Sequence, residues 1–353
     1  MLLFLQKKKN LAPSALQVTN TQPERHANLP RMTRRITLEP APSLRLPGNT
    51  DCNLPSFWDS RGFHLFTSAQ TPSLTSGPSL DHLAHPHPVR LLGAEHLRWW
   101  IEAIHRDEAG DLWALYHRED YARRCPDRLW FTVPAIGIAR SHDGGHSFHD
   151  LGLVLRDPGV DDRCEASPNT YFPGGVGDPS WAIDPASGHA YILYSAYTGR
   201  AEHQGIQIAR LALADLANPV GKVWRWSGAG WTEPGIGGTG RPVLPAARSW
   251  HEHGSDAFWG PSVHRNLALG CHVVLLNRTQ GPDWTQEGAY IAYIDDIADP
   301  ASWTPPERLF PHGGWYAQVI GEPALRGTDS LAGDHPRLFL HGHSNHHLRF
   351  TID

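Results

Sequence analysis

One strand–turn–strand design recurs along the chain, and this repetition constrains the fold more than any single residue does. In its clearest copy, residues 176–184 read as a short strand whose front end carries a carboxylate beside a proline, Asp178-Pro179. A polar turn and a second strand rich in aromatic and β-branched residues follow at 188–195. A period of about 40 to 50 residues is typical of propeller blades. Four further segments begin in the same way, at 53–59, 99–105, 258–265 and 315–320.

The segments that follow these first strands complete the repeat. Second strands are expected at 63–66, 112–116, 191–194 and 272–276, and, after a longer interval, at 337–340. Third strands are clear in three repeats, at 136–139, 206–209 and 289–292, each followed by a turn and an apolar or Trp-containing segment. Residues 36–38 would close the ring from the N-terminal side. The sequence therefore predicts an all-β protein, a five-bladed β-propeller of four-stranded antiparallel blades.

Composition agrees with this fold class and excludes some partners. The 353 residues include 14 Trp, 34 Gly and 30 Pro, and only 19% are charged, which suits an all-β chain with many turns. The net charge of −5 and the lack of a basic stripe predict no nucleic-acid partner. No internal apolar run is long enough to span a membrane. The 23 His show no metal-ligand spacing in a helical register, so we expect no metal site and no cofactor.

The N-terminal segment differs from the rest of the chain. Residues 1–35 are polar, contain proline and lack periodicity, so we expect a disordered extension before a single propeller domain at 36–353. An upstream, mis-assigned start codon would look the same. Residues 1–5 are apolar, but the lysine run at 7–9 follows them, which is the wrong order for a secretory signal. The sequence leaves the compartment open.

Cysteine usage gives no disulfide scaffold. The four cysteines lack CxxC spacing and are too few for a stapled fold: Cys52, Cys125, Cys164 and Cys271. We expect unpaired, buried thiols. The alternative is a disulfide between Cys125 and Cys164, because both fall in loops on the rim expected to carry the site.

The turn at residues 141–148 matches the Asp-box pattern S-x-D-x-G-x-x-F. Its Asp and Gly suit a tight turn and its terminal aromatic fills the blade, so its chemistry is structural. The pattern is common in sialidases and other propellers. It is expected between the third and fourth strands of a blade, and it supports the fold without indicating catalysis.

Propeller geometry predicts which residues share a site. The first strand of each blade lines the central channel, so the starts of first strands and the ends of second strands lie on one rim. Carboxylates, aromatic rings, arginines and amides on one concave surface suit a sugar, because its faces stack and its hydroxyls need donors and acceptors. The predicted catalytic carboxylates are Asp178, Glu102, Glu119 and Glu287. The predicted substrate-binding residues are Asn53, His117, Arg118, Asp256, Trp259, Arg278, Trp315, Tyr316 and Gln318.

Three short motifs resemble those of the five-bladed propellers of glycoside hydrolase family 43 and its relatives. They are Asp178-Pro179-Ser180 in the third repeat, residues 100–104 in the second and residues 260–264 in the fourth. The likeness extends from about residue 50 to 353, and it depends on the order and spacing of the motifs. In that family the equivalent of Asp178 orients and tunes the catalytic acid. His264 is expected to be a core histidine; the alternative, from the resemblance, is a channel histidine near an axial ion.

Two of the three carboxylates of the family pattern are missing. The resemblance expects the base in an Asp-Pro pair of the first blade, where this chain has Leu54-Pro55 beside Asn53. It expects the acid before Gly-Pro in the fourth blade, where this chain has Trp259. Glycoside hydrolysis normally uses two carboxyl groups, about 5 Å apart in retaining enzymes and about 6.5 to 9.5 Å apart in inverting ones. A rearranged pair would have to come from Glu102, Glu119, Asp178, Asp256 and Glu287.

The sequence thus favours a carbohydrate-active protein that cleaves glycosidic bonds of an oligosaccharide or polysaccharide with an altered carboxylate set. A carboxylic acid of raised pKa would protonate the leaving oxygen while a second carboxylate activates water or attacks. Asp178 and Glu102 are the first choices, with Glu119 or Glu287 completing the set. A glycan-binding propeller without hydrolysis is the main alternative. A sialidase would need an arginine cluster and a Tyr–Glu pair, for which Arg118, Arg278 and Tyr316 are a thin basis.

Overall fold

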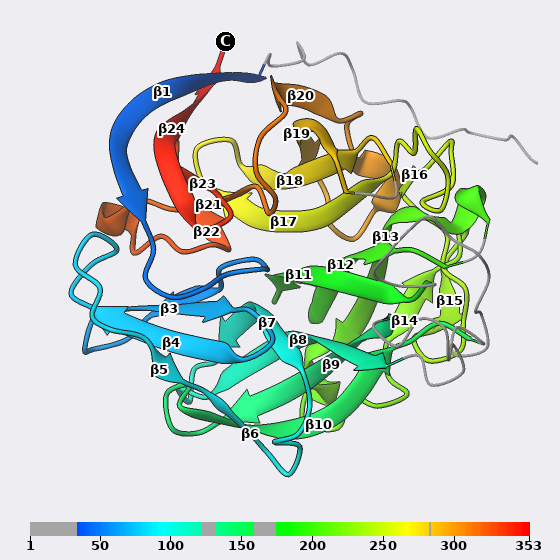
Figure 1. The fold of residues 1–353 in the computed structure, drawn as a ribbon, viewed down its shortest axis with the longest axis horizontal. Helices are drawn as coiled ribbons and strands as arrows, with labels where there is room; N and C mark the ends of the chain where they lie inside the picture. Colours follow the sequence, from blue (N-terminus) through cyan, green and yellow to red (C-terminus); the bar gives the residue numbers. More distant parts are fainter. Residues whose placement is uncertain (1–33, 122–130, 159–173, 199, 282–283) are drawn as a thin grey trace, which may run out of the picture. The chain divides into compact units, whose positions relative to one another are not determined.

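Residues 34–353 fold into five β-sheets arranged as the blades of a propeller (Figure 1). The computed structural model describes residues 34–121, 131–158, 174–198, 200–281 and 284–353. Helical backbone in this described part is limited to the 3₁₀ turns η2 (Ala201–His203), η3 (Leu213–Asp215), η4 (Pro300–Ser302) and η5 (Pro323–Leu325). None of these turns is long and apolar enough to cross a bilayer. The all-β fold class expected from the sequence is confirmed.

The first two blades follow one another along the chain. Blade one contains β2 (Ser56–Trp58), β3 (Phe63–Ser68), β4 (Pro72–Gly77) and β5 (His87–Pro88). Blade two contains β7 (Trp99–Arg106), β8 (Leu112–Tyr121), β9 (Thr132–Ser141) and β10 (Ser147–Leu155). The short strand β6 (Arg90–Leu92) adds to blade two by pairing in parallel with β10.

Blades three and four carry additional short strands. Blade three contains β11 (Val176–Asp184), β12 (His189–Ala196), β13 (Gly205–Ala212), β14 (Trp224–Trp226) and β15 (Trp231–Pro234), with β16 (Leu244–Pro245) paired to β13. Blade four contains β17 (Phe258–Asn266), β18 (Cys271–Thr279), β19 (Gln286–Ile294) and β20 (Glu307–Pro311). The strand β22 (Leu331–Ala332) pairs in parallel with β17.

The fifth blade joins the two ends of the described chain. It contains β21 (Gln318–Ile320), β23 (Arg337–Leu340), β24 (His343–Ile352) and, on its outer edge, β1 (Arg34–Arg45). β1 runs antiparallel to β24, from the pair Arg34 and Ile352 to the pair Arg45 and His343. The N-terminal strand expected at 36–38 therefore closes the ring, as part of a longer strand. Five blades, each with an antiparallel four-stranded unit, confirm the predicted architecture.

Two of the predicted first strands are shorter than expected. Residues 53–59 form a strand only from Ser56, because Pro55 has no N–H and the Leu54 N–H donates to the Gln318 side chain instead (2.8 Å). Residues 315–320 form a strand only from Gln318, since Tyr316 has left-handed backbone (φ 56°) that a strand cannot continue.

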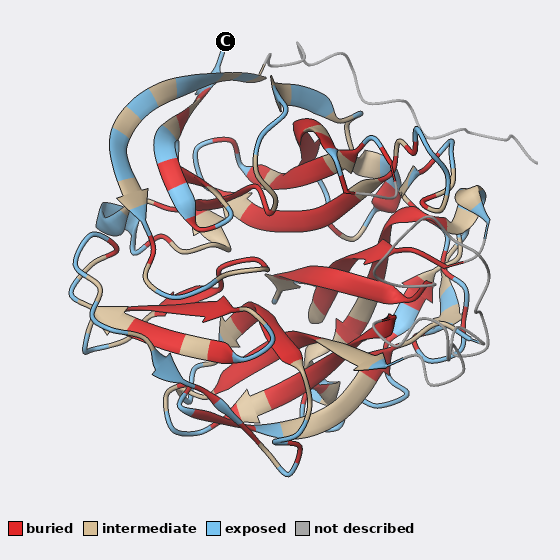
Figure 2. Cartoon of the chain, viewed as in Figure 1, coloured by how far each residue is buried: buried red, intermediate tan, exposed pale blue. Residues whose placement is uncertain are grey.

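The core lies between the blades. Figure 2 shows burial concentrated in the inner strands, including β11, β12, β17 and β18, whereas β1 alternates between exposed and half-buried residues. One core cluster joins blades two and three through Leu115, Ile138, Trp181 and Ile192. Another joins blades three and four through Leu193, Ile208, Val263 and Val274. Both faces of an inner strand are covered by neighbouring blades, so these strands are apolar almost throughout rather than alternating.

The turn with the Asp-box pattern lies between β9 and β10. The Asp143 carboxylate accepts hydrogen bonds from the Ser147 backbone N–H (3.0 Å), the Ser147 hydroxyl (2.6 Å) and the Ser141 hydroxyl (2.8 Å). Phe148 is fully buried in the core of blade two. These contacts stabilise the turn, and none of them involves the residues of the candidate site.

The inner strands of three blades contain a β-bulge at corresponding places. In β7 the register shifts around Glu102, in β11 around Asp178-Pro179 and in β17 around Gly260-Pro261. Asp178 and Gly260 have left-handed backbone, with φ 48° and 57°. A bulge adds one unpaired residue and turns its side chain away from the regular pleat. The bulges therefore determine which side chains are directed toward the centre of the ring.

Candidate functional site

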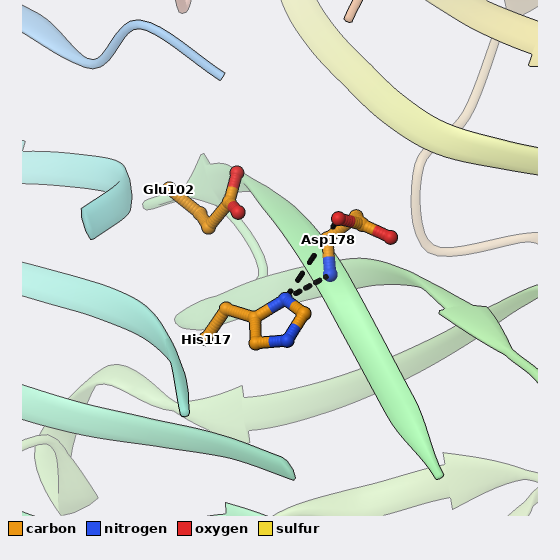
Figure 3. A group of neighbouring side chains, drawn as sticks. All are labelled: Glu102, His117 and Asp178. Atoms are coloured by element: carbon orange, nitrogen blue, oxygen red, sulfur yellow. Dashed lines mark hydrogen bonds and ion pairs between the residues drawn. The ribbon is translucent and has the colours of Figure 1, made fainter. Parts of the chain in front are cut away.

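Three buried side chains meet near the centre of the ring (Figure 3). Glu102 comes from β7, His117 from β8 and Asp178 from β11, and one nitrogen or oxygen atom of each lies within 4.8 Å of those of the other two. Their exposed fractions are 1%, 6% and 4%. β11 of blade three packs against β7 and β8 of blade two, which explains why residues so distant in sequence converge. We call this group the acid–histidine cluster.

Asp178 is the most firmly held member of the cluster. The Tyr316 hydroxyl donates to its Oδ1 (3.3 Å), and the Tyr197 hydroxyl donates to its Oδ2. Its backbone N–H donates to Nδ1 of His117 (3.2 Å), and its Oδ1 lies 3.7 Å from the same nitrogen. The bulge and three partners thus fix the carboxylate of Asp178 in one orientation.

Glu102 occupies the bulge of β7 and has fewer partners. Its Oε2 accepts a hydrogen bond from the backbone N–H of Asn53 (3.0 Å). Burial, and after it the negative charge of Asp178, raises the pKa of Glu102 well above its ordinary value. The side chain of Asn53 in turn donates to the Pro261 carbonyl (3.2 Å), which ties blade one to blade four beside the cluster. Glu102 is therefore a carboxyl group that holds its proton more tightly than an exposed one.

His117 lies between two carboxylates. Its Nδ1 faces Asp178, and its Nε2 lies 3.6 Å from Oε1 of Glu119. Burial alone lowers the pKa of this imidazole, but hydrogen bonding and charge from Asp178 and Glu119 outweigh burial and raise the pKa to about 10. Gly177 leaves room for the ring, since a Cβ there would lie 2.6 Å from Cε1 of His117.

Glu119 supports the cluster from behind His117. Its Oε2 accepts hydrogen bonds from Nη2 of Arg98 (2.7 Å) and from the hydroxyl of Thr132 (3.0 Å). Burial raises the pKa of Glu119, but His117 and Arg98 together lower it further than burial raises it. Asp51, on the other side, has a pKa raised by burial and then by the charge of Asp178. Acidic groups thus outnumber cations around the cluster.

An aromatic wall stands beside Asp178, formed by Tyr197, Trp250, Trp259, Trp284, Trp315 and Tyr316. The ring of Trp259 lies 5.2 Å from that of Tyr316 and 5.0 Å from that of Trp284, centroid to centroid. Its indole N–H donates to the side chain of Gln286 (3.1 Å). Most of the wall is buried, but Trp315 is half-buried and stacks against His341. The wall offers flat apolar rings next to the carboxylates.

The structure brings together many of the residues predicted for the site. Glu102, Asp178, His117 and Glu119 contact one another directly or through His117, and Asn53 and Tyr316 bond to the two acids. Gln318 is fully buried and accepts the N–H of Leu54, the residue next to Asn53. Leu54 itself and Trp259, which stand where the resemblance expected carboxylates, are both buried.

Other predicted residues lie in separate contacts. Oε1 of Glu287 forms an ion pair with Nη1 of Arg308 (2.8 Å), and Oε2 of Glu287 lies 3.8 Å from Nη1 of Arg278. Nη2 of Arg278 lies 3.6 Å from Oδ2 of Asp256. The Asp256 carboxylate also accepts two backbone N–H groups, from residues 247 and 248, at 2.9 Å. Arg118 pairs with Asp120 (2.9 Å). None of these contacts joins the acid–histidine cluster, so a role of these residues in the site stays a prediction.

Sequence reasoning did not select several residues that contact the cluster, contact Glu119 beside it or act on it by charge. Tyr197 was not predicted as a site residue, although it immediately follows β12. Arg98, Thr132 and Asp51 were not identified. The available signal was position: Arg98 directly precedes the first strand of blade two, and Asp51 precedes the start of the first repeat.

The histidine and cysteine expectations have different outcomes. His264 is fully buried in β17, and burial, followed by the charge of His272, lowers the pKa of His264 to about 3. Its ring nitrogens have no hydrogen-bond partner among the described residues, and Phe350 lies 6.2 Å away, so it resembles a core residue. Cys52 and Cys271 are free and buried. The alternative disulfide between Cys125 and Cys164 lies outside the described residues.

Fold and site together define a class: a five-bladed β-propeller with a buried carboxyl pair near its centre and an aromatic wall beside that pair. No protein-family model and no curated protein matches the sequence. Among solved structures, the endo-arabinase of Bacteroides thetaiotaomicron is similar, with a TM-score of 0.50 and 15% identity over 88% of this chain and 94% of that one.

Two further solved structures are similar at lower scores. The arabinanase of Bacillus subtilis has a TM-score of 0.46 and 13% identity, over 87% of this chain and 95% of that one. A thermostable family-43 glycoside hydrolase has a TM-score of 0.47 and 14% identity, over 85% and 88%. At these identities the comparisons concern the fold alone, and the fold is the one expected from the resemblance to family 43.

Proposed function

We propose that this chain is a carbohydrate-active protein that hydrolyses glycosidic bonds with Glu102 and Asp178 as its carboxyl pair. One observation carries the proposal: oxygen atoms of these two buried carboxyl groups lie within 4.8 Å of each other near the centre of the propeller. The similarity of the fold to an endo-arabinase is consistent with it. Hydrolysis by two carboxyl groups needs such a pair on either side of the scissile bond.

The two carboxyl groups would have different roles. Burial and the charge of Asp178 raise the pKa of Glu102, which suits it to protonate the leaving oxygen as the glycosidic bond breaks. Asp178, oriented by two tyrosine hydroxyls, would attack the anomeric carbon and form a covalent intermediate. Deprotonated Glu102 would then take a proton from the water that releases the sugar. The short separation favours this retaining course, for which about 5 to 5.5 Å is usual.

The aromatic wall gives the proposed substrate a place to bind. Trp259 and Tyr316 stand beside Asp178, and Trp315 extends the wall to a half-buried position. Aromatic faces stack on sugar rings, and the wall lies next to Asp178, the proposed nucleophile. We therefore propose an oligosaccharide or polysaccharide as the substrate class.

Glycan binding without hydrolysis is the second candidate, and a specific observation favours it. Leu54 and Trp259 occupy the places where the resemblance expects the base and the acid, and each is only 1% exposed. Leu54 has no ionisable group and Trp259 is engaged with Gln286. A protein of this kind would retain the sugar-binding wall while lacking turnover.

Activity measurements separate the two candidates. Release of reducing sugar from arabinan and of chromophore from a panel of aryl glycosides would be compared for the wild type, Glu102→Gln and Asp178→Asn. If the pair is catalytic, Glu102→Gln lowers kcat by about 10²- to 10⁴-fold, the usual loss for a general acid. Asp178→Asn, which removes the proposed nucleophile, lowers kcat at least as much. Equal activity of the wild type and both variants would contradict the assigned roles. A wild type that binds glycans on an array but hydrolyses none would support the second candidate.

A further inference from the structure

A cavity of about 600 Å³ opens at blade five, apart from the acid–histidine cluster. It lies between residues 45–50, which lead from β1 to blade one, and residues 340–343, where β23 turns into β24. This turn is on the rim of the candidate site, because Gln318 at the start of β21 pairs with Phe339 near the end of β23. The volume is within the range of about 300 to 1,000 Å³ that is usual for ligand pockets.

Two contacts connect the cavity to the candidate site. The ring of His341, in the lining, stacks on the ring of Trp315 in the aromatic wall, with centroids 6.2 Å apart and planes at 15°. Thr50, also in the lining, is followed by Asp51, whose carboxyl group interacts electrostatically with both Asp178 and His341. Asp51 itself is not part of the lining. A sugar chain that lies along the aromatic wall would therefore reach the cavity.

The lining offers a cation and hydrogen-bond donors but no carboxylate. Arg45 supplies a guanidinium with five N–H donors, and His343, which pairs with Arg45 across β1 and β24, supplies an imidazole. The side-chain amide of Asn49 lines the same cavity. In the described part of the chain, the side chains of Arg45 and Asn49 have no hydrogen bond or ion pair. The donors of the cavity are therefore available to a ligand.

Arg45 differs in this respect from other arginines near the candidate site. Arg98 is hydrogen-bonded to Glu119, and Arg118 is paired with Asp120. The planar fork of an arginine matches two oxygens of one anionic group, so an unpaired arginine in a pocket favours an anionic ligand. We propose that the cavity binds an acidic sugar unit of the substrate, whose carboxylate or sulfate ester pairs with Arg45. This inference rests on the proposed function, because it names the kind of sugar that the proposed site takes.

The backbone of His341 is a further indication. His341 and Gly342 are the two residues of the turn between β23 and β24, and their φ angles are 49° and 71°. Two-residue turns with positive φ at both positions strongly favour Asn, Asp or Gly. A residue other than glycine that is held in this region tends to mark a functional position. The turn places the imidazole of His341 between the aromatic wall and the cavity, where its flat face and N–H suit a sugar.

The test compares ligands that differ only in charge. The full-length protein would be titrated calorimetrically with trisaccharides of galacturonic and of glucuronic acid, each against its methyl ester, and with a sulfated galactose trisaccharide against its unsulfated form. We expect at least one acidic form to bind about tenfold more tightly than its neutral form, since hydrogen bonds to charged groups are the stronger kind. The pairs that show the difference distinguish a carboxylate from a sulfate ester.

Substitutions in the lining test the role of Arg45. Arg45 is exposed, so its replacement should leave the fold intact. Arg45→Gln should remove the preference for the acidic form and leave the affinity for the neutral form unchanged, whereas Arg45→Lys keeps the charge without the fork and should retain part of the preference. Arg35→Gln, at an exposed arginine on the same strand but outside the cavity, is the matched control and should bind like the wild type. His341→Asn, which suits the left-handed turn, should weaken binding of acidic and neutral forms alike.

The proposal is overturned if no acidic trisaccharide binds, if each binds no more tightly than its neutral form, or if Arg45→Gln keeps the preference. Failure of the proposed function gives a different result, because it is measured by the release of reducing sugar. Binding of an acidic trisaccharide that depends on Arg45, without such release, would leave this inference intact and contradict hydrolysis. Hydrolysis of neutral arabinan without any preference for acidic sugars would keep the proposed function and remove this inference.

Discussion

Several local features of the structure hold the side chain of Asp178 in one orientation. Its backbone is left-handed, which costs an ordinary L-residue about 1 to 2 kcal/mol. The following Pro179 and the register shift in β11 hold it there, and two tyrosine hydroxyls complete its orientation. Residues kept in such sparsely populated conformations tend to mark functional positions. This agrees with the central role given to Asp178 above.

A half-buried acid, Asp329, gives a pH-dependent prediction. Its carboxylate accepts hydrogen bonds from the backbone N–H (2.7 Å) and hydroxyl (3.0 Å) of Ser56, and burial raises its pKa from 3.8 to about 7. Between these values the unfolded chain has lost this proton while the folded protein keeps it. The contribution of Asp329 to stability is therefore fully present below pH 3.8 and falls as pH rises toward 7.

Replacement of Asp329 by Asn removes this titration. We expect the free energy of unfolding of Asp329→Asn to vary less between pH 5 and 7 than that of the wild type, whose slope contains up to about 1.4 kcal/mol per pH unit from this group. Urea denaturation at pH 5, 6 and 7 measures the difference. Parallel pH profiles for the two proteins would show that Asp329 titrates alike in the folded and unfolded states.

The sequence predicted part of the site at this scale, for a physical reason. Glu102 and Asp178 lie at the starts of recognisable first strands, so the repeat alone predicted that they would meet. Arg278 lies at the end of a second strand and Glu287 follows it, so both were expected on the same rim, yet Arg308 on the outer strand β20 pairs with Glu287 instead. Such competition depends on neighbours outside the repeat pattern, and only coordinates reveal it.

At the scale of elements, the bulges of β7, β11 and β17 are the features that build the site. Sequence periodicity located these strands, because their aromatic and β-branched residues are distinctive. It did not locate the bulges, since one inserted residue changes no composition. A trace is visible afterwards in two of them: Pro-Ser follows the left-handed residue in β11 and β17, at 179–180 and 261–262. The short strands β6, β16 and β22 were missed because they are too short to show alternation.

The bulge of β17 gives a prediction about stability. Gly260 has φ 57°, and a Cβ there would lie 3.0 Å from the buried side-chain amide of Asn277. Gly260→Ala should therefore combine backbone strain of about 1 to 2 kcal/mol with the cost of displacing Asn277. Gly188→Ala is the matched control, because Gly188 has φ 70° but open space around its Cβ position.

Chemical denaturation of the two variants separates these contributions. We expect both to lose stability, with Gly260→Ala losing more than Gly188→Ala by about 1 kcal/mol or more, as is usual for overpacking in a buried site. Equal losses would mean that Asn277 moves aside without cost. A smaller loss for Gly260→Ala would argue that the bulge is not rigid.

At the scale of the whole molecule, the sequence predicted the blade number and the closing strand correctly. Repeats are visible because each blade must bury both faces against its neighbours, which imposes the same apolar pattern five times. The length of the N-terminal strand that closes the ring was not predicted. β1 spans 12 residues, of which the prediction included three, since its exposed and half-buried positions carry little apolar signal.

Ring closure by β1 gives the last prediction. β24 buries Leu348 and Phe350, and β1 covers its outer edge from Arg34 to Arg45. A chain beginning at Leu46 would expose that edge and part of the apolar cluster beneath it, at about 1.5 to 3 kcal/mol for each large side chain uncovered. We expect its melting temperature to fall by about 10 °C or more. A chain beginning at Arg34 keeps all the described strand pairs. If residues 1–35 are the extension expected from the sequence, its melting temperature should equal that of the full-length protein. Calorimetry measures the melting temperatures of the three proteins. If the chain beginning at Leu46 has the same melting temperature as the others, blade five is stable without its N-terminal strand.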